Sequence, residues 1–193
     1  MRTYVVDMDD LCDATAHRLP LLAKLKEKYP ALKVTLFTIP ARTSVATIDA
    51  AKVLGDWVAL GVHGHRHTRG ECLAWTKEEA LYKINAAKEM GIDAPLFRAP
   101  GWFIDGETYE ACKELGYVVC THKDHHKRMA GVQQYVYNMP NGRAKDTIST
   151  HGHLTQVSTV DNFIGDMLDD GRLSFARKAT FLWPHEAAVE LAP

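Results

Sequence analysis

The sequence of 193 residues has no long apolar run, no excess of charge of one sign and few cysteines. No window approaches the run of about 18 apolar residues that a membrane-spanning helix needs, so membrane insertion is not expected. The first ten residues, MRTYVVDMDD, contain three acids before an apolar stretch of signal-peptide length develops, so we expect a cytoplasmic protein. Lys and Arg number 23 against 24 Asp and Glu, which provides no general attraction to nucleic acid or to an anionic membrane.

The four cysteines are scattered and form no Cys-x-x-Cys pair, which argues against a thiolate zinc site and fits a reducing compartment. They are Cys12, Cys72, Cys112 and Cys120. Hydrophobic residues make up 46% and charged residues 24%, so an ordered globular chain is expected. With no linker, repeat or low-complexity tract, residues 1–193 are interpreted as a single domain that can bury a core of its own. The sequence leaves the oligomeric state open.

Apolar or β-branched strands alternate with amphipathic helices along the chain. Strands are expected at 3–8, 34–39, 57–62, 94–99, 117–121, 134–138, 146–150 and 180–183. Helices are expected at 14–29, 45–54, 77–90, about 109–115 and 160–168. Pro20 either kinks the first helix or marks a late start, and Thr76 with Glu79 forms a capping box before the third. This alternation predicts a parallel sheet, flat or closed into a barrel, with functional groups at the carboxyl ends of its strands.

Polar side chains follow several of these strands, and we expect them to gather on one rim. They are Asp9 and Asp10, His63 to His67, Arg98 to Trp102, His122 to Asp124, and His151 to His153. His63 and His67 are four residues apart, a spacing that places both imidazoles on one face of a helical turn, as a two-histidine metal site requires. An Asp with two His leaves a position open for water, as in catalytic zinc sites. The plainer alternatives are a turn or helix cap at the acids and a solvated loop at the histidines.

The order of these motifs resembles the NodB-homology polysaccharide deacetylases, which are metal-dependent carbohydrate esterases. Asp9-Asp10 match the family's Thr-Phe-Asp-Asp-Gly, residues 61–67 match its His-(Ser/Thr)-x-x-His, and residues 98–102 match its Arg-x-Pro segment. The match covers roughly residues 1–155. The resemblance implies a single-domain α/β fold, a distorted or partial (β/α) barrel with about six to seven parallel strands.

The resemblance also assigns roles to individual residues. It implies that Asp10, His63 and His67 hold one divalent metal ion, with Zn²⁺ as the default and Co²⁺, Ni²⁺, Mn²⁺ or Fe²⁺ compatible with the same ligands. Asp9 would be the general base that activates water at the metal, and Arg98 would orient Asp9 and keep it ionised. Residues 148–151 match the family's Leu-x-His segment, which makes His151 the general acid. The implied substrate is an N- or O-acetylated sugar or polysaccharide, or a small N-acyl compound.

The sequence departs from the family pattern at several positions. Met8 and Leu11 replace the motif Phe and Gly, so Asp7 could serve in place of a neighbouring acid. Residues 122–125 lack the family's Asp-x-x-Asp-Trp, and Asp124 is the acid there that could pair with Arg98 or contact substrate. His153 competes with His151 for the acid role, because both face one side if their strand continues.

Pro100 and Trp102 are assigned to substrate binding, since they lie on the turn that follows Arg98, and Trp102 could stack on a sugar ring. Asp124 and His153 are also expected to contact substrate. His65 is expected to point away from the metal. The remaining histidines are interpreted as surface or loop residues; they are His17, His122, His125, His126 and His185.

Two other functions remain open. His63-x-His65 resembles the start of the His-x-His-x-Asp-His signature of metallo-β-lactamase-like hydrolases, although His67 stands at the aspartate position. The second is a barrel that binds a metal or a saccharide without turnover, although such a binder does not need both a base and an acid.

Overall fold

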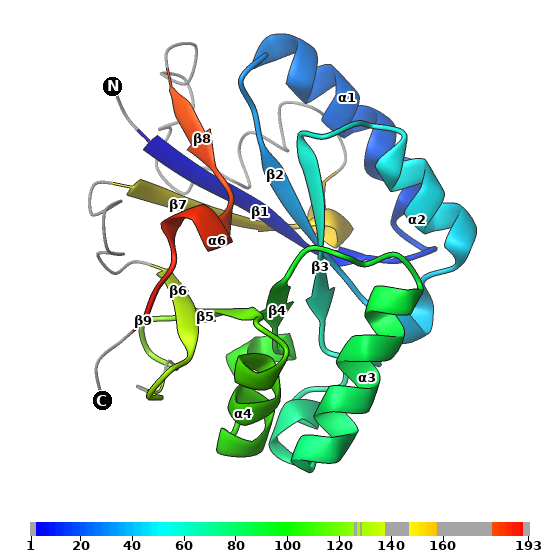
Figure 1. Ribbon diagram of the computed structural model, residues 1–193. Helices are drawn as coiled ribbons and strands as arrows, with labels where there is room; N and C mark the ends of the chain where they lie inside the picture. The colour runs from blue at the N-terminus through cyan, green and yellow to red at the C-terminus, as the bar shows by residue number, and fades with distance from the viewer. Residues whose placement is uncertain (1–2, 126, 128, 138–146, 158–178, 191–193) are drawn as a thin grey trace.

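The computed structural model describes residues 3–125, 127, 129–137, 147–157 and 179–190 (Figure 1). Its strands are β1 (Thr3–Leu11), β2 (Val34–Thr38), β3 (Val58–His63), β4 (Leu96–Arg98), β5 (Val118–His122), β6 (Gln133–Tyr137), β7 (Thr147–His153), β8 (Thr180–Leu182) and β9 (Val189–Glu190). Its α-helices are α1 (Leu19–Lys28), α2 (Val45–Lys52), α3 (Lys77–Glu89), α4 (Gly106–Glu114) and α6 (Pro184–Ala187). Among the described helices, none combines the length and the apolar character needed to cross a membrane.

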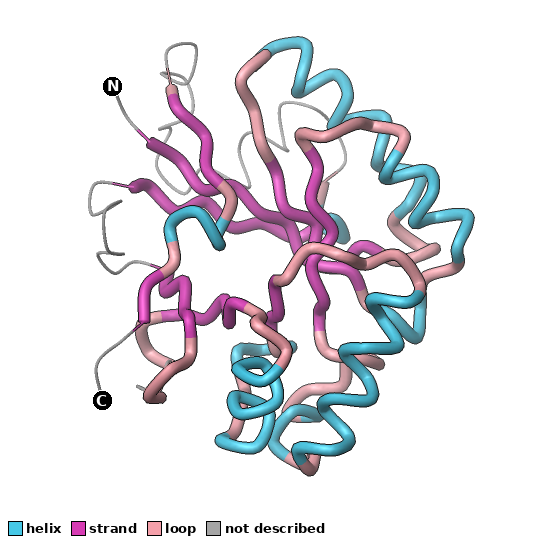
Figure 2. The backbone as a smooth tube through the Cα atoms, in the orientation of Figure 1, coloured by secondary structure: helices cyan, strands magenta, loops and turns pink. Residues whose placement is uncertain are grey.

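Seven parallel strands follow one another in the order β7, β1, β2, β3, β4, β5 and β6. β8 pairs in parallel with the first residues of β1, and β9 pairs antiparallel with β6. The sheet curls, and helices α1 to α4 lie along its outer side (Figure 2). Within the described residues no backbone pairing joins β6 to β7, where Tyr135 Oη and Ser149 Oγ lie 2.5 Å apart. The fold is therefore the expected partial (β/α) barrel.

Alternate residues of each strand point to opposite faces of the sheet. On β1, Tyr4 and Met8 belong to the main core under the helices, whereas Val5 belongs to a smaller apolar cluster inside the curl. Asp7 and Asp9 share the inner face with Val5 and lie toward the carboxyl end of the strand. The interior of the partial barrel is therefore apolar at one end and polar at the other.

Within the described residues the expected elements are present, with differences at their ends, and the strand expected at 146–150 continues to His153. The first helix begins only at Leu19, after a 3-10 turn at Ala16–Arg18, and Pro20 lies in its first turn, where a missing backbone N–H costs nothing. The first strand continues beyond residue 8 through both acids to Leu11, with a break in register between Met8 and Leu11. The predicted capping box of Thr76 and Glu79 is present at the start of α3. The helix expected at 160–168 lies outside the described residues.

Candidate active site

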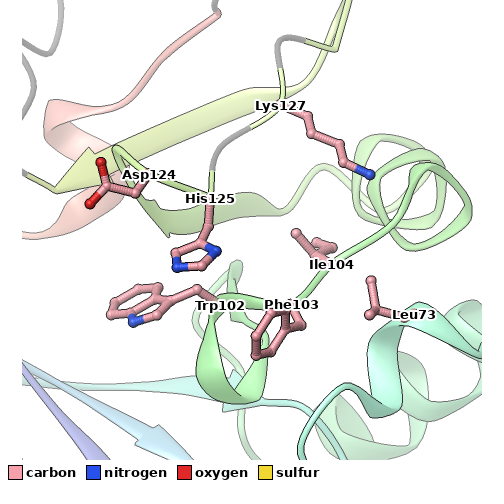
Figure 3. Close-up of a pocket in the computed structure, with 7 residues that line it drawn as sticks. All are labelled: Leu73, Trp102, Phe103, Ile104, Asp124, His125 and Lys127. Carbon is pink, nitrogen blue, oxygen red and sulfur yellow. The ribbon is translucent and has the colours of Figure 1, made fainter.

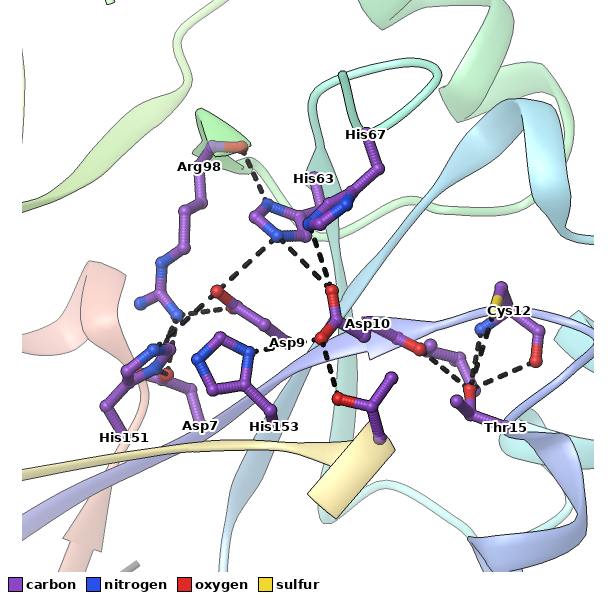
Figure 4. Close-up of polar contacts among 12 residues, drawn as sticks. Asp7, Asp9, Asp10, Cys12, Thr15, His63, His67, Arg98, His151 and His153 are labelled. Carbon is purple, nitrogen blue, oxygen red and sulfur yellow. Dashed lines mark hydrogen bonds and ion pairs between the residues drawn. The ribbon is translucent and has the colours of Figure 1, made fainter. Parts of the chain in front are cut away.

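Asp10, His63 and His67 meet at the carboxyl ends of β1 and β3 (Figure 4). His67 Nε2 lies 3.0 Å and His63 Nε2 lies 3.9 Å from Asp10 Oδ1. One ligand atom from each of the three residues falls within 4.8 Å of the others. One carboxylate oxygen and two imidazole nitrogens are a donor set that zinc and other divalent transition metals accept.

The ring of His63 is oriented by the backbone of the next strand. Its Nδ1 lies 3.1 Å from the carbonyl oxygen of Arg98, which faces His63 in the β3–β4 ladder. A proton on Nδ1 then donates to this carbonyl and leaves Nε2 free on the side of the acids. Burial lowers the pKa of His63, which favours the neutral ring that a metal ligand must have.

His67 reaches the site from a loop, which corrects the expected helical turn. The residue has φ 60°, in the left-handed region, and no helix forms between β3 and the 3-10 turn at Glu71–Leu73. The carboxylate of Glu71 accepts hydrogen bonds from the backbone N–H groups of His65, Arg66 and His67 at 2.9–3.0 Å. Glu71 therefore holds the loop in the shape that presents His67.

The second oxygen of Asp10 has partners of its own. His153 Nδ1 lies 3.1 Å from Asp10 Oδ2, and Thr155 Oγ1 donates to the same oxygen at 3.2 Å. Although burial acts to raise the pKa of Asp10, its hydrogen bonds with His153 and His67 lower it, and these bonds raise the pKa of both histidines. His153 thus faces the site beside His151, as expected if the strand continued, but its partner is the carboxylate of Asp10.

Arg98 is completely buried and joins two carboxylates. Its Nη1 lies 2.6 Å from Asp7 Oδ1 and 2.6 Å from Asp9 Oδ1, and its Nη2 donates to Tyr137 Oη. The guanidinium carbon also lies 3.9 Å from the ring centre of Phe37. Burial acts to raise the pKa of Asp9, but the charge of Arg98, assisted by nearby histidines, lowers it to about 2. Asp9 is therefore ionised at neutral pH.

His151 lies between two acids of β1. Its Nδ1 is 2.8 Å from Asp7 Oδ1, and its Nε2 is 3.7 Å from Asp9 Oδ2. Asp9 Oδ2 in turn lies 3.4 Å from His63 Nε2, so it stands between His151 and the three possible metal ligands. The ring of Trp102 lies edge-on to His151, with ring centres 5.1 Å apart.

The formal charges fit a single divalent cation. Asp7, Asp9 and Asp10 carry three negative charges and Arg98 carries one positive charge, so one divalent ion neutralises the cluster when the imidazoles are neutral. Asp9, His151 and His153 form a second group with metal-ligand spacing. A second dication there would lie beside the Arg98 guanidinium and leave an excess of buried positive charge, which opposes binding.

Three residues other than glycine have positive φ among the described residues, and all three belong to this site. They are Asp10 (70°), His67 (60°) and Trp102 (67°). Such conformations each cost about 1–3 kcal/mol and persist where the surrounding structure imposes them. At Asp10, Thr15 Oγ1 donates to the backbone carbonyl at 2.7 Å. The backbone strain of the described chain is thus concentrated where the polar groups converge.

No protein-family model and no curated protein sequence matches the chain. Solved structures do match it. The Xyl-CE4 domain of a multidomain xylanase from the hindgut metagenome of Trinervitermes trinervoides is 17% identical, over 96% of this chain and 89% of its own, with a TM-score of 0.59. A family 4 acetyl xylan esterase from Clostridium thermocellum, in complex with a cobalt ion, is 15% identical over 97% and 90%, also with a TM-score of 0.59. This chain has the fold of the family 4 carbohydrate esterases.

The same fold also occurs in a protein described as inactive. A CE4 family pseudoenzyme from Bacillus anthracis is 14% identical, over 93% of this chain and 66% of its own, with a TM-score of 0.56. The carbohydrate esterase fold predicted from the motifs is therefore confirmed, whereas turnover has to be argued from the side chains of the site.

Within this carbohydrate esterase fold, Trp102 borders a cavity of about 330 Å³ (Figure 3). The cavity is lined by Leu73, Trp102, Phe103, Ile104, Asp124, His125 and Lys127. Apolar and aromatic walls with a few polar groups are typical of small-molecule sites. No residue of the polar cluster lines the cavity, and Trp102 connects the two, since its ring also lies against His151.

Some predicted site residues lie elsewhere. Asp124 pairs with His122 at 3.2 Å and not with Arg98, whose carboxylate partners in the described part of the chain are Asp7 and Asp9. Asp7, from β1, takes the place beside Arg98. Pro100 is buried beside Gly64. Among the described residues, the remaining histidines belong to neither group with metal-ligand spacing. His17 is beside Arg18, His125 borders the cavity and His185 stacks on Trp183. His126 is outside the described residues.

Sequence reasoning did not assign roles to Glu71, Tyr137 and Thr155. Glu71 stands four residues after His67 in the same polar segment, so an acid able to cap the backbone of the loop was visible there. Tyr137 and Thr155 carry no such signal, since only the pairing of β5 with β6 and of β1 with β7 brings them to the site.

Proposed function

We propose that this protein is a metal-dependent hydrolase that removes acetyl groups from an acetylated carbohydrate. The observation that carries the proposal is the position of Asp9. One of its oxygens is held by Arg98 at 2.6 Å, and the other lies 3.4 Å from His63 Nε2 and 3.7 Å from His151 Nε2. An ionised carboxylate therefore stands between a set of metal donors and a histidine, which is the arrangement that acid–base hydrolysis requires.

Asp10, His63 and His67 would hold the metal ion. The fit is supported by the backbone carbonyl that fixes His63 and by the hydrogen bonds that occupy Asp10 Oδ2, since ligands in metal sites are commonly oriented this way. When bound, a divalent ion polarises the acyl carbonyl and lowers the pKa of water. Zn²⁺ suits the donors, and the cobalt ion of the Clostridium thermocellum esterase makes Co²⁺ a natural alternative.

Asp9 would act as the general base. Its pKa of about 2 keeps it unprotonated at neutral pH, and Arg98 fixes the orientation of the carboxylate. His151 would act as the general acid and protonate the departing amine or alcohol through Nε2, which is the nitrogen nearer Asp9. His153 is less suited to this role because its Nδ1 is bound to Asp10.

An acetylated carbohydrate is the substrate class that best fits the surroundings of His151, the proposed general acid. Trp102 lies against His151 and borders the cavity, so a sugar ring stacked on the indole would place its acetyl group near Asp9 and His151. The similar proteins named for acetyl xylan esterase and xylanase activity favour a sugar polymer or oligomer. A small N-acyl compound is the alternative substrate class for the same cavity.

Binding without turnover is the second candidate function, and the pseudoenzyme with the same fold favours it. The test combines metal analysis with acetate release from N-acetylated chito-oligosaccharides and O-acetylated xylo-oligosaccharides. We expect about one metal ion per chain, lost in His63→Ala and kept in Asp9→Asn. Acetate release should disappear in His63→Ala and fall by about 10²-fold or more in Asp9→Asn.

His65→Ala is the matched control, because this side chain comes from the same loop and lies outside the donor group. It should keep both metal and activity. Wild-type protein that binds metal but releases no acetate from either substrate would establish the binder. Wild-type protein that neither binds metal nor releases acetate would overturn the metal-dependent hydrolase and the metal binder alike.

A further inference from the structure

We propose that Asp7 is the positioning residue of the general acid: it fixes the ring of His151 so that Nε2 faces the reacting group. The inference rests on the proposed function. The motif resemblance assigns roles to Asp9 and Asp10 but none to Asp7, and Asp7 is not among the groups with metal-ligand spacing in the described residues.

The ladder between β1 and β7 pairs these two residues. Asp7 and His151 are direct partners in the parallel register, two residues before the pair of Asp9 and His153. Since alternate residues share a face, all four side chains point into the curl. Asp7 is fully buried, and its Oδ1 lies 2.8 Å from His151 Nδ1 and 2.6 Å from Arg98 Nη1 (Figure 4).

This contact determines which nitrogen of His151 carries the fixed proton. A carboxylate oxygen and a bare ring nitrogen are both acceptors and would repel each other at 2.8 Å, which favours a proton on Nδ1 that donates to Asp7. Arg98 Nη1 also lies 3.1 Å from Nδ1, but its two hydrogens are directed to Asp7 Oδ1 and Asp9 Oδ1 at 2.6 Å, so we assign Nδ1 as the donor to Asp7. Nε2 is then the nitrogen left on the side of Asp9, 3.7 Å from its Oδ2.

The other candidate carboxylate for this role is used elsewhere. Asp124 follows β5 and is paired with His122 at 3.2 Å, with its side chain largely exposed. Asp9 is directed to Arg98 through Oδ1 and to His63 through Oδ2. Within the described residues, Asp7 is therefore the acid that meets Nδ1 of His151.

The alternative is that Asp7 serves only as a counter-ion that keeps Arg98 buried. The two roles predict different kinetics. Asp7→Asn removes the charge but keeps a similar shape, and with N-acetylated oligosaccharide it should lower kcat by about 10²-fold with little change in KM. In a His151→Asn background the same substitution should cause no further loss, because the residue through which it acts is gone.

An activated ester separates the roles again. The leaving group of 4-nitrophenyl acetate departs without a proton, so both Asp7→Asn and His151→Asn should hydrolyse it nearly as fast as the wild type does. Equal losses on the ester and the amide, or a full additional loss in the His151→Asn background, would show that Asp7 acts through Arg98 and would overturn the proposal. Asp49→Asn on the exposed face of α2 is the control for loss of an acid.

A measurement on the wild-type chain avoids variants that fail to fold. The ¹⁵N spectrum of the histidine rings identifies the tautomer of neutral His151, and we expect the proton on Nδ1. A neutral ring with its proton on Nε2 would overturn the proposal. This readout needs no turnover, so it decides whether Asp7 fixes the ring of His151 even if acetate release is never observed and the proposed function fails.

Discussion

The Nδ1 atom of His63 lies 3.1 Å from the backbone carbonyl oxygen of Arg98. The backbone of Arg98 therefore orients one candidate metal ligand, while its side chain, buried and pointing inward, binds Asp7 and Asp9. The short strand β4 thus links the two halves of the site. Substitutions of the Arg98 side chain should disturb the acids and leave the orientation of His63 intact.

Arg98→Met should destabilise the fold and spare metal binding. Removing the guanidinium leaves two buried carboxylates without their counter-ion, a change that costs about 3–5 kcal/mol. Urea unfolding measures this loss, and metal titration of the folded variant should show wild-type stoichiometry. Arg98→Lys keeps the charge but loses the planar fork, so its loss should be smaller. Equal stability of Arg98→Met and wild type would contradict the assignment of Arg98 as the buried counter-ion.

His153→Ala should weaken metal binding without abolishing it. His153 and Thr155 fix Asp10 Oδ2, and loss of a partner that orients a metal ligand lowers affinity by about 10–100-fold. Competition with a chromogenic chelator gives the affinity, and His65→Ala should match the wild type. If His153→Ala abolished binding completely, His153 would have to be a ligand itself.

Gly64→Ala should distort the loop that carries His67. Gly64 has φ +58°, and a Cβ there would lie 2.3 Å from Glu71 Oε1 and 2.6 Å from Pro100 Cδ. We expect a loss of metal affinity and about 1–3 kcal/mol of stability. Gly116→Ala is the matched control, since Gly116 has φ +70° with nothing within 4 Å of a Cβ, so it carries the strain without the collision. Equal effects at both positions would show that the close approach to Glu71 is unimportant.

The metal-free protein should lose stability between pH 4 and pH 2. The folded-state pKa of Asp9 is lowered from 3.8 to about 2, so its stabilising contribution is complete above 3.8 and disappears as the pH falls through 2. The contribution is on the order of 2 kcal/mol. Urea midpoints across this range should fall less steeply for Asp9→Asn than for the wild type or for Asp49→Asn. Identical slopes would contradict the Arg98–Asp9 pairing.

Local patterns predicted most of the fold. The capping box of Thr76 and Glu79 marks α3 unambiguously, and the apolar runs mark the strands. The end of β1 was missed because two acids normally signal a turn, whereas here Arg98 and His153 satisfy them inside a strand. The start of α1 was ambiguous because Pro20 is equally compatible with a kink.

The site was predictable as a set of residues but not as a set of pairs. Motif order brought Asp9, Asp10, His63 and Arg98 together, since parallel strands end on one rim. The partners of Arg98 depend on which side chains reach it across the inner face of the sheet, and the sequence does not give this. Asp124 was expected to pair with Arg98, but in the structure Asp7 does so and Asp124 pairs with His122. The spacing of His63 and His67 suggested a helical turn, but glycine at position 64 and the Glu71 carboxylate allow a loop to reach the same place.

The left-handed backbone at Asp10, His67 and Trp102 bears on how this protein could be engineered. A procedure that selects sequences for thermal stability alone would favour glycine at these three positions, because glycine adopts that conformation without strain. Each replacement would remove a carboxylate, an imidazole or an indole from the site at the carboxyl ends of the strands. Variants evolved or designed for heat resistance should therefore lose functional side chains first at these positions. Keeping the three residues unchanged is the condition for stabilising the fold without losing the site.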